Sequence, residues 1–268
     1  MYSGTTIGTS SGNAIGAHQR IDRIARRTLT SLIGETTHSF PTSSEILYFE
    51  GNNGPDAVKR KSPSVDEPWH YIDPKTMKDT SLLTMIEDHI TNLTEALRRK
   101  DEHRSAFEAA WLAHAIVDGL TPAHHYPLAD KIEELFGMPH HERKTIKEKN
   151  IIKGVSRRDT FAKNWEYWGA KGIFSAHTLF EFGVASSLLS WRDLVKIDQG
   201  DLEIVTKKGY SKYFQRVLTE IDSFDMYDDF QKHGWNTRTA RLVRRDLFPR
   251  LVQAVVLAWY VSYERAQS

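Results

Sequence analysis

One segment of the chain, WLAHAIVDGLTPAHHYP, combines imidazoles and a carboxylate at a spacing suited to metal binding. His114 and Asp118 are four residues apart, so on a helix they share one face and can hold the same ion. Gly119 and Pro122 are expected to end that helix, and His124 follows on the next turn. A turn at this point would bring the third side chain back beside the first two.

A second pair of the same kind lies further along, in FSAHTLFEFGV. His177 and Glu181 are again four residues apart, and bundles build sites for several metals from such pairs on neighbouring helices. Taken alone, a histidine and an acid at this spacing more often form a surface hydrogen-bonded pair. Both pairs, however, occur in apolar segments, where a buried charge requires a partner or an ion.

Three further candidates lie upstream, and each also has an ordinary structural explanation. His70 stands between Trp69 and Tyr71 in a loop, where packing is commoner than metal ligation. Asp56 follows a turn rich in Gly, Asn and Pro, and such an aspartate usually stabilises the turn itself. His18 opens a predicted helix and could be no more than a helix-terminal residue. None of the three is persuasive alone.

The composition limits which ions and partners are plausible. The 268 residues include no cysteine, so a metal must be held by nitrogen and oxygen, for which twelve histidines are available. Lys and Arg (36) balance Asp and Glu (35), which gives no support to duplex DNA binding. No run of about 20 apolar residues predicts a membrane span. The polar N-terminus does not resemble a secretory signal, so the sequence as it stands reads as cytoplasmic.

Helices are predicted to position all of these groups. A flexible lead-in at 1–17 precedes a helix that begins at His18, and 51–74 is predicted to be a loop because Gly and Pro are frequent there. Pro249 is expected to kink the last helix. No alternating strand pattern is apparent, so the prediction is one compact all-α domain over 18–268 with a metal cluster at the bottom of a cleft. The other predicted helices cover about 41–50, 82–97, 102–120, 172–190, 208–231 and 236–266, with a short one in PLADKIEELFG.

Taken together, these residues resemble the zinc-dependent phospholipase C family and the related single-strand-specific zinc nucleases. The resemblance rests on HxxxDxxxPxH followed by HxxxE, and it spans about 18–266. It implies a mostly helical fold, two or three Zn²⁺ ions, and hydrolysis of a phosphodiester. The implied ligands are His18, Asp56, His70, His114, Asp118, His124, His177 and Glu181.

The resemblance also assigns these ligands to separate ions. The first ion would take His70, His114, Asp118 and Asp56; the second His124, His177 and Glu181; and a third His18 with a bridging Asp118. Asp56 would in addition act catalytically, by orienting the attacking water or accepting its proton. The family's third zinc also uses an N-terminal Trp, and this sequence has no Trp before Trp69.

Three functions remain open at this point. The preferred one is phospholipase C-like hydrolysis of a phospholipid head group at a membrane surface. Glu181 and the lack of cysteine favour it over a nuclease or nucleotidase, which usually has Asp at that position and commonly has disulfides. A non-catalytic zinc-binding domain is the third. The family is generally exported, so the compartment stays open, and the long segment 128–170 is interpreted as an insertion and a candidate lid.

The remaining histidines and two tryptophans have simpler interpretations. His125 adjoins a proposed ligand and is expected to support it. Trp165 and Trp168 are expected to pack in the core rather than to stack on a ligand. Surface positions are predicted for the histidines that fit no ligand spacing, namely His38, His89, His103, His140, His141 and His233.

Overall fold

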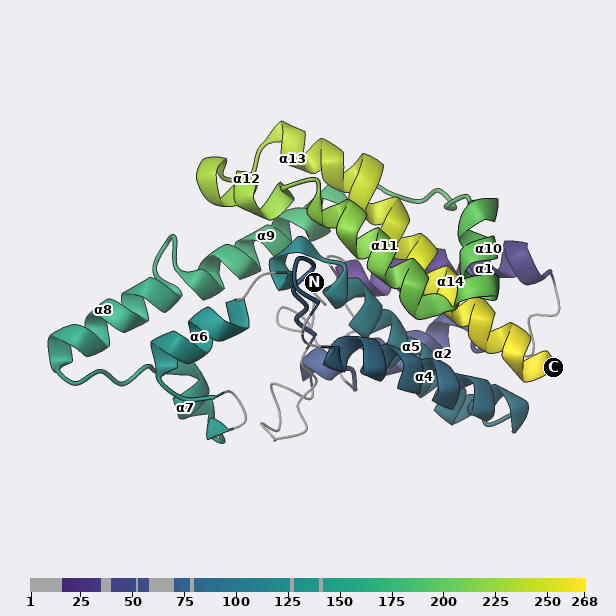
Figure 1. Ribbon diagram of the computed structural model, residues 1–268, viewed down its shortest axis with the longest axis horizontal. Coiled ribbons are helices and arrows are strands. Elements are labelled where there is room, and N and C mark those ends of the chain that lie inside the picture. Colours follow the sequence, from purple (N-terminus) through teal and green to yellow (C-terminus); the bar gives the residue numbers. More distant parts are fainter. Residues whose placement is uncertain are drawn as a thin grey trace.

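The protein is built from helices, as a computed structural model shows (Figure 1). The described residues are 16–34, 40–51, 53–57, 70–77, 80–125, 128–139 and 142–268, and within them there is no strand. The all-α prediction is confirmed. None of the helices in these ranges is long and apolar enough to cross a bilayer. Most of the predicted lead-in, as well as His38, His140 and His141, lies outside the described residues.

The main core forms where α5 (Glu102–Gly119) packs against α4 (Ser81–Arg98) and α2 (Ser43–Glu50). Asp101 caps the start of α5 by accepting a hydrogen bond from the Arg104 backbone N–H. The helix is rich in buried alanines, which allow its neighbours to approach closely. At Gly119 the approach is so close that an added Cβ would lie 2.4 Å from Leu82. A larger residue there would have to displace the Leu82 side chain of α4.

Helix α14 (Phe248–Gln267) is the other central element, and it packs against α1 (Ala17–Ile33), α4 and α5. Its fully buried Trp259 donates from Nε1 to the Ala109 carbonyl of α5, at 3.0 Å. Helix α1 also contacts α2 and α5, and His18 near its start is buried. Because α1 begins at Ala17, the helix predicted from His18 is confirmed.

The C-terminal third contains more helices than the sequence predicts. The expected helix over 208–231 is two helices, α11 (Tyr210–Asp222) and α12 (Met226–His233), separated by a turn with Asp225 at φ 50°. Helix α10 (Gln199–Lys208) was not predicted. The last predicted helix is a continuous run of α13 (Thr237–Leu242), a π-helical segment (Val243–Leu247) and α14. The π-helical segment immediately precedes the first turn of α14, where Pro249 lacks an N–H, as expected for an interrupted helix.

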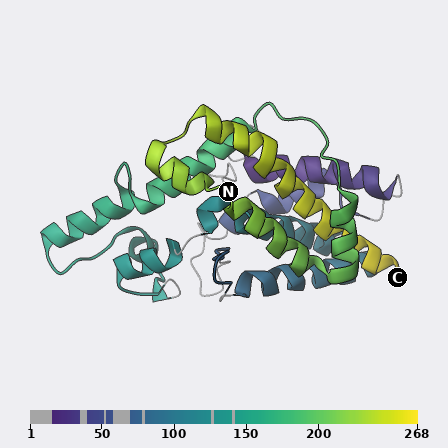
Figure 2. The ribbon, with the colours of Figure 1, turned by 45° about the horizontal axis from the view of Figure 1, so that its top comes forward.

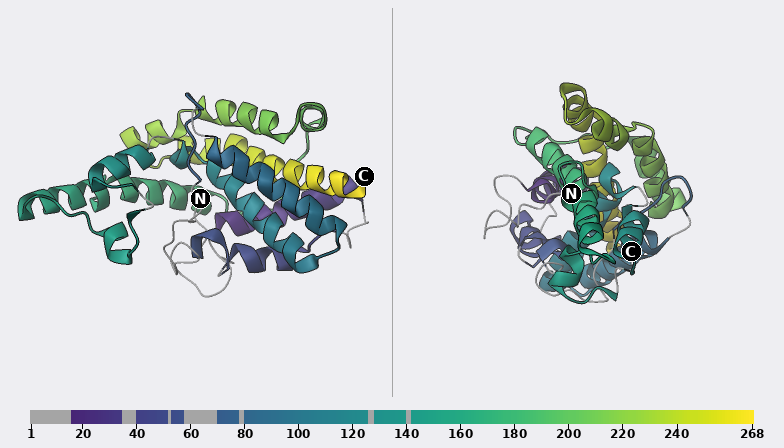
Figure 3. Two further views of the ribbon diagram at one scale, coloured as in Figure 1. Left: turned by 60° about the horizontal axis from the view of Figure 1, so that its bottom comes forward. Right: turned by 90° about the vertical axis from the view of Figure 1, so that its left-hand side faces the viewer.

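One part of the chain extends away from the core, as Figures 1, 2 and 3 show. We call residues 142–171 the arm; they include α7 (Ile146–Asn150) and α8 (Arg157–Trp168), neither of which was predicted. Helix α8 leads into α9 (Ile173–Ser187) and packs against it and α6 (Leu128–Phe136). A separate small apolar cluster holds these elements together: Ile132, Leu135, Ile152 and Tyr167, with Tyr71, Phe136 and Ile173 against it.

Candidate metal centre

The buried end of α5 supplies the centre of the site. His114 and Asp118 are both buried, and they face the same side of α5 as their spacing predicts. The helix ends at Gly119, and a 3₁₀ turn (Pro122–His124) follows. The Thr121 hydroxyl donates to the Val117 carbonyl and helps to close that end of the helix. The turn brings His124 back beside Asp118, as expected from the sequence.

The Asp118 carboxylate lies between four imidazoles from four segments. Its Oδ2 atom is 3.0 Å from His70 Nδ1 and 3.1 Å from His114 Nε2. Its Oδ1 atom is 3.1 Å from His18 Nε2 and 3.8 Å from His124 Nε2. The two oxygens thus face different sets of histidines, which is the arrangement that a bridging carboxylate requires.

A second group is formed by His124, His177 and Glu181. The Oε1 atom of Glu181 is 3.0 Å from Nε2 of His124 and 3.0 Å from Nε2 of His177. Helix α9 provides the last two residues one turn apart, and the 3₁₀ turn after α5 provides the first. Tyr71 stacks on the His124 ring at a centroid distance of 4.9 Å and so forms a wall of this group. The sequence indicated Tyr71 only as a neighbour of His70.

Asp56 lies at the more open side of the site. Its Oδ1 atom is 3.6 Å from His114 Nε2, and its side chain is 30% exposed. It is therefore close to the group of His70, His114 and Asp118 but more accessible than any of them. A carboxylate that is both close to buried ligands and reachable by water is suited to exchanging protons with water.

Glu50 belongs to the site but was not recognised in the sequence. It is fully buried at the end of α2, and its two carboxylate oxygens lie 3.0 and 3.2 Å from His114 Nδ1. The same carboxylate is 3.9 Å from His18 Nδ1. The rings of His18 and His114 stack at 4.0 Å, nearly parallel. Because Glu50 faces the Nδ1 side, both Nε2 atoms are directed toward Asp118. The one available signal was a glutamate within the apolar run ILYFEG.

The charges at this site depend strongly on one another. Burial alone would lower the pKa of His114, but the carboxylates of Glu50, Asp118 and Asp56 raise it well above its usual value. Burial would likewise raise the pKa of Asp118, but positive charge around it, including that of His114 and His18, lowers it well below its usual value. The carboxylates therefore favour a cation beside the Nε2 atoms, whether that cation is a proton or a metal ion.

His124 has the opposite tendency. Burial and the neighbouring charge of His177 lower the pKa of His124 to about 4, against the attraction of Asp118. At neutral pH this imidazole is neutral, which is the form that binds a metal. Glu181 is ionised, because nearby positive charge, including that of His177, lowers its pKa despite burial.

Among the residues that the structure describes, three groups of donor atoms are compact enough to hold a metal ion. They are His70 with His114 and Asp118; His124 with His177 and Glu181; and His18 with Glu50 and His114, and the atoms within each group lie within 4.8 Å of one another. Seven of the eight predicted ligands thus belong to such groups, and Asp56 lies beside one.

The donor set also fits zinc chemically. The Nε2 atoms of His18 and His114 are 3.1 Å from Asp118 oxygens but are not aligned to hydrogen-bond with them. Donor atoms around one tetrahedral zinc ion are roughly 3.3 Å apart, and they point at the ion and not at each other. Buried imidazoles and carboxylates without thiolates are compatible with zinc, and the coarse prediction of a metal-binding group is supported at these residues.

The other described histidines differ in their surroundings. His103 and His233 are exposed, as predicted. His89 was predicted to lie on the surface, but it is half-buried against the buried Glu108, so this prediction was wrong. His125 is buried and its Nε2–H donates to the Gly119 carbonyl at 3.1 Å. It therefore supports the end of α5 that carries Asp118.

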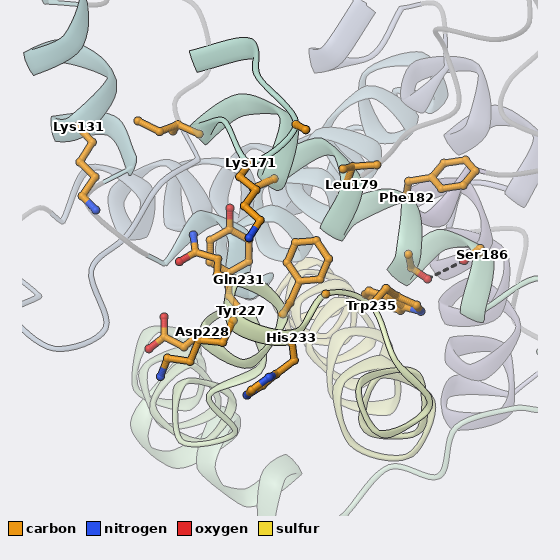
Figure 4. A pocket seen from close by; sticks show the side chains of 17 residues that line it. Lys131, Lys171, Leu179, Phe182, Ser186, Tyr227, Asp228, Gln231, His233 and Trp235 are labelled. Atoms are coloured by element: carbon orange, nitrogen blue, oxygen red, sulfur yellow. Dashed lines mark hydrogen bonds between the residues drawn. The ribbon is translucent and has the colours of Figure 1, made fainter. Parts of the chain in front are cut away.

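A hollow of about 1180 Å³ lies along α9, on the side of the helix away from His177 and Glu181 (Figure 4). Leu179 and Phe182 of α9 line it together with Tyr227 of α12 and Trp235. None of the eight predicted ligands lines it. The hollow is therefore not the cleft that was predicted above the metal cluster, and that cleft stays a prediction.

Comparisons of the chain with known protein families, curated proteins and solved structures find no match. The resemblance to the phospholipase C family therefore rests on the sequence motifs alone.

Proposed function

We propose that the chain is a zinc-dependent phosphodiester hydrolase that acts on phospholipids in the manner of a phospholipase C. The observation that carries the proposal is the convergence on Asp118 of imidazoles from α1, the segment at His70, α5 and the turn after it. Burying so many ionisable groups without an ion would be costly, because each must be desolvated. A site of this kind is better explained by metal binding than by folding alone.

The proposed ligands would be distributed over separate zinc ions. His70, His114 and Asp118 would hold one ion, and His124, His177 and Glu181 another, with Asp118 between the groups. His18 faces the second oxygen of Asp118 and would contribute to a third ion. When bound, zinc acts as a Lewis acid toward phosphate oxygens and lowers the pKa of a bound water to about 7.

Two carboxylates have roles beyond holding ions. Glu50 accepts a hydrogen bond from His114 Nδ1 and thereby keeps the Nε2 lone pair directed into the site. Asp56 is the accessible carboxylate, and it orients the attacking water and accepts its proton. Water attacks phosphorus, the bond to the leaving alkoxide oxygen breaks, and that oxygen takes up a proton from solvent, so the diester becomes a monoester and an alcohol.

The test combines elemental analysis with a small panel of phosphodiesters. We expect two or three zinc ions per chain and release of a phosphorylated head group from phospholipid, both abolished by a chelator and restored by zinc. Release of nucleotides from single-stranded DNA or RNA, with no action on lipid, would replace this proposal with the nuclease alternative. Bound zinc without hydrolysis of any diester would favour a non-catalytic domain. A chain that binds no zinc would overturn all three.

A further inference from the structure

The arm differs in charge from the rest of the chain. Residues 142–171 contain nine Lys and Arg against four Asp and Glu, a net charge of +5, whereas the whole chain has a net charge of +1. The remaining residues therefore carry −4. This asymmetry would direct the arm, and not the rest of the chain, toward a negatively charged surface.

Large apolar side chains are exposed along the same arm. Val155, at the turn before α8, is 99% exposed, and it is followed on α8 by Phe161 (70%), Trp165 (63%) and Trp168 (41%). The last three are spaced by four and three residues, so they form one stripe on the helix. Phe161 and Trp165 stack at 6.3 Å. The expectation that Trp165 and Trp168 pack in the core was wrong, because α8 packs against the body through Tyr167.

Exposed cations surround the apolar tip. Lys153, Arg157 and Arg158 are all exposed and lie within three residues of Val155. Figure 1 shows this end of α8 at the far left, away from the core. Three cations around a projecting valine combine attraction to anions with an apolar group that can leave water.

We propose that the arm binds an anionic lipid membrane peripherally, with Val155 and the stripe of Phe161, Trp165 and Trp168 entering the head-group region. Tryptophan favours this interface because its ring is apolar and its N–H is polar. The Nε1–H of Trp168 already donates to the Asn150 carbonyl at 2.8 Å. Each Lys or Arg near an anionic leaflet adds about fivefold to partitioning. Aromatic and basic residues also occur on surfaces for single-stranded nucleic acid, but the aliphatic Val155 and Ile151 cannot stack on bases, which favours lipid.

The arm is joined to the candidate metal centre through Tyr71. This residue packs against the small cluster of α6 and α8 and also stacks on His124. Membrane binding by the arm would therefore hold the site near lipid head groups. The binding itself does not require metal or hydrolysis, so its failure can be distinguished from failure of the proposed function.

The test measures sedimentation of the full chain with vesicles of phosphatidylcholine, alone or with about one third phosphatidylserine. We expect binding only to the anionic vesicles, and weaker binding at higher ionic strength. Arg157→Glu combined with Arg158→Glu should reduce it about tenfold or more, and acidic residues are well tolerated in the first turn of α8. Lys207→Glu combined with Lys208→Glu in α10 makes the same change in net charge and should leave binding intact.

A second pair of variants tests the apolar stripe. Trp165→Ser should weaken binding several-fold, and Tyr48→Ser, which changes another exposed aromatic residue (60% exposed) on α2, should not. Unchanged helical circular dichroism would show that each variant is folded. No binding to anionic vesicles, equal effects of the arm and control variants, or binding of a single-stranded oligonucleotide in place of vesicles would each overturn the proposal.

Discussion

Helix α5 buries two carboxylates, and the chain neutralises them differently. Glu108 is fully buried and forms ion pairs with Arg104 and His89, so a permanent guanidinium charge lies beside it. Asp118, ten residues later, lies among four imidazoles, which are neutral unless they bind a proton or a metal. One carboxylate is balanced by a cation of the chain, and the other would be balanced by a cation from solution.

The same residue types therefore have different surroundings at two places on one helix. A histidine and an acid occur at both places, but only at Asp118 do the imidazoles converge from several segments with their nitrogens directed at a common point. A buried carboxylate with its own arginine needs no ion. Convergence, and not the presence of His and Asp or Glu, is therefore the feature that indicates a metal centre.

Removing the metal should give the largest effect. If the free zinc concentration is about 1,000 times the Kd, zinc stabilises the folded state by about 4 kcal/mol. Chelation should therefore lower Tm by roughly 10 °C. Calorimetry with and without chelator measures the shift. A Tm that does not depend on zinc would mean that Asp118 is balanced by the chain itself, as Glu108 is.

Asp118→Asn should reproduce the effect of chelation without removing zinc from solution. The amide keeps the shape of the carboxylate but not its charge, and both oxygens face imidazoles. We expect zinc content to fall toward zero and hydrolysis to be lost. Elemental analysis of the purified variant measures the first, and a phosphodiester assay the second. Full zinc retention would contradict a bridging role for Asp118.

Glu108→Gln is the matched control on the same helix. It leaves Arg104 and His89 without their buried carboxylate, which should cost about 3 kcal/mol of unfolding free energy. Zinc content and the Tm increase on adding zinc should be unchanged, because Glu108 is not in any of the three groups. Denaturant titration with and without zinc separates the two quantities. Loss of zinc from this variant would show that Glu108, like Asp118, contributes to metal binding.

Glu50→Gln tests an intermediate case, a buried carboxylate that faces the Nδ1 atoms of the proposed ligands His114 and His18. The amide can still accept a hydrogen bond from His114 Nδ1, but it lacks the charge that makes the imidazole more basic. Zinc affinity should fall about 10- to 100-fold while the site still fills at high zinc. Titration with a competing chelator gives the affinity. An unchanged affinity would mean that Glu50 serves only to pack α2 against α5.

The sequence predicts the helical class and the site's local pairs, but not the contacts that complete it. His114 with Asp118 and His177 with Glu181 follow from helical spacing, which is local. Glu50 could not be assigned, because its importance depends on α2 crossing α5, which spacing within one helix does not encode. Helix α8 of the arm was missed because its apolar residues face outward at Phe161 and Trp165, contrary to the pattern of a core-facing helix.

The capping of α2 should give the smallest effect, and it shows how far the position of Glu50 depends on its own helix. Thr42 and Glu45 form a reciprocal capping box, and the backbone N–H of Thr42 donates to the Glu45 carboxylate at 2.7 Å. Thr42→Ala removes the cap and should cost about 1 kcal/mol. Zinc affinity should change little, because the buried Arg26 separately holds the preceding segment by donating to the Pro41 carbonyl.

The capping box also predicts a pH dependence. The Thr42 backbone N–H and hydroxyl lower the pKa of Glu45. A carboxyl whose pKa is lower in the folded state stabilises the fold fully above its unfolded pKa, and that contribution is lost as pH falls through the folded pKa. The stability difference between the wild-type protein and Glu45→Gln should therefore be constant near neutral pH and disappear in acid. Chelated samples should be used, since acid also releases metal and would otherwise hide so small a change.

A large loss of zinc affinity in Thr42→Ala at neutral pH would show instead that the position of Glu50, and with it His114, depends on this exposed cap.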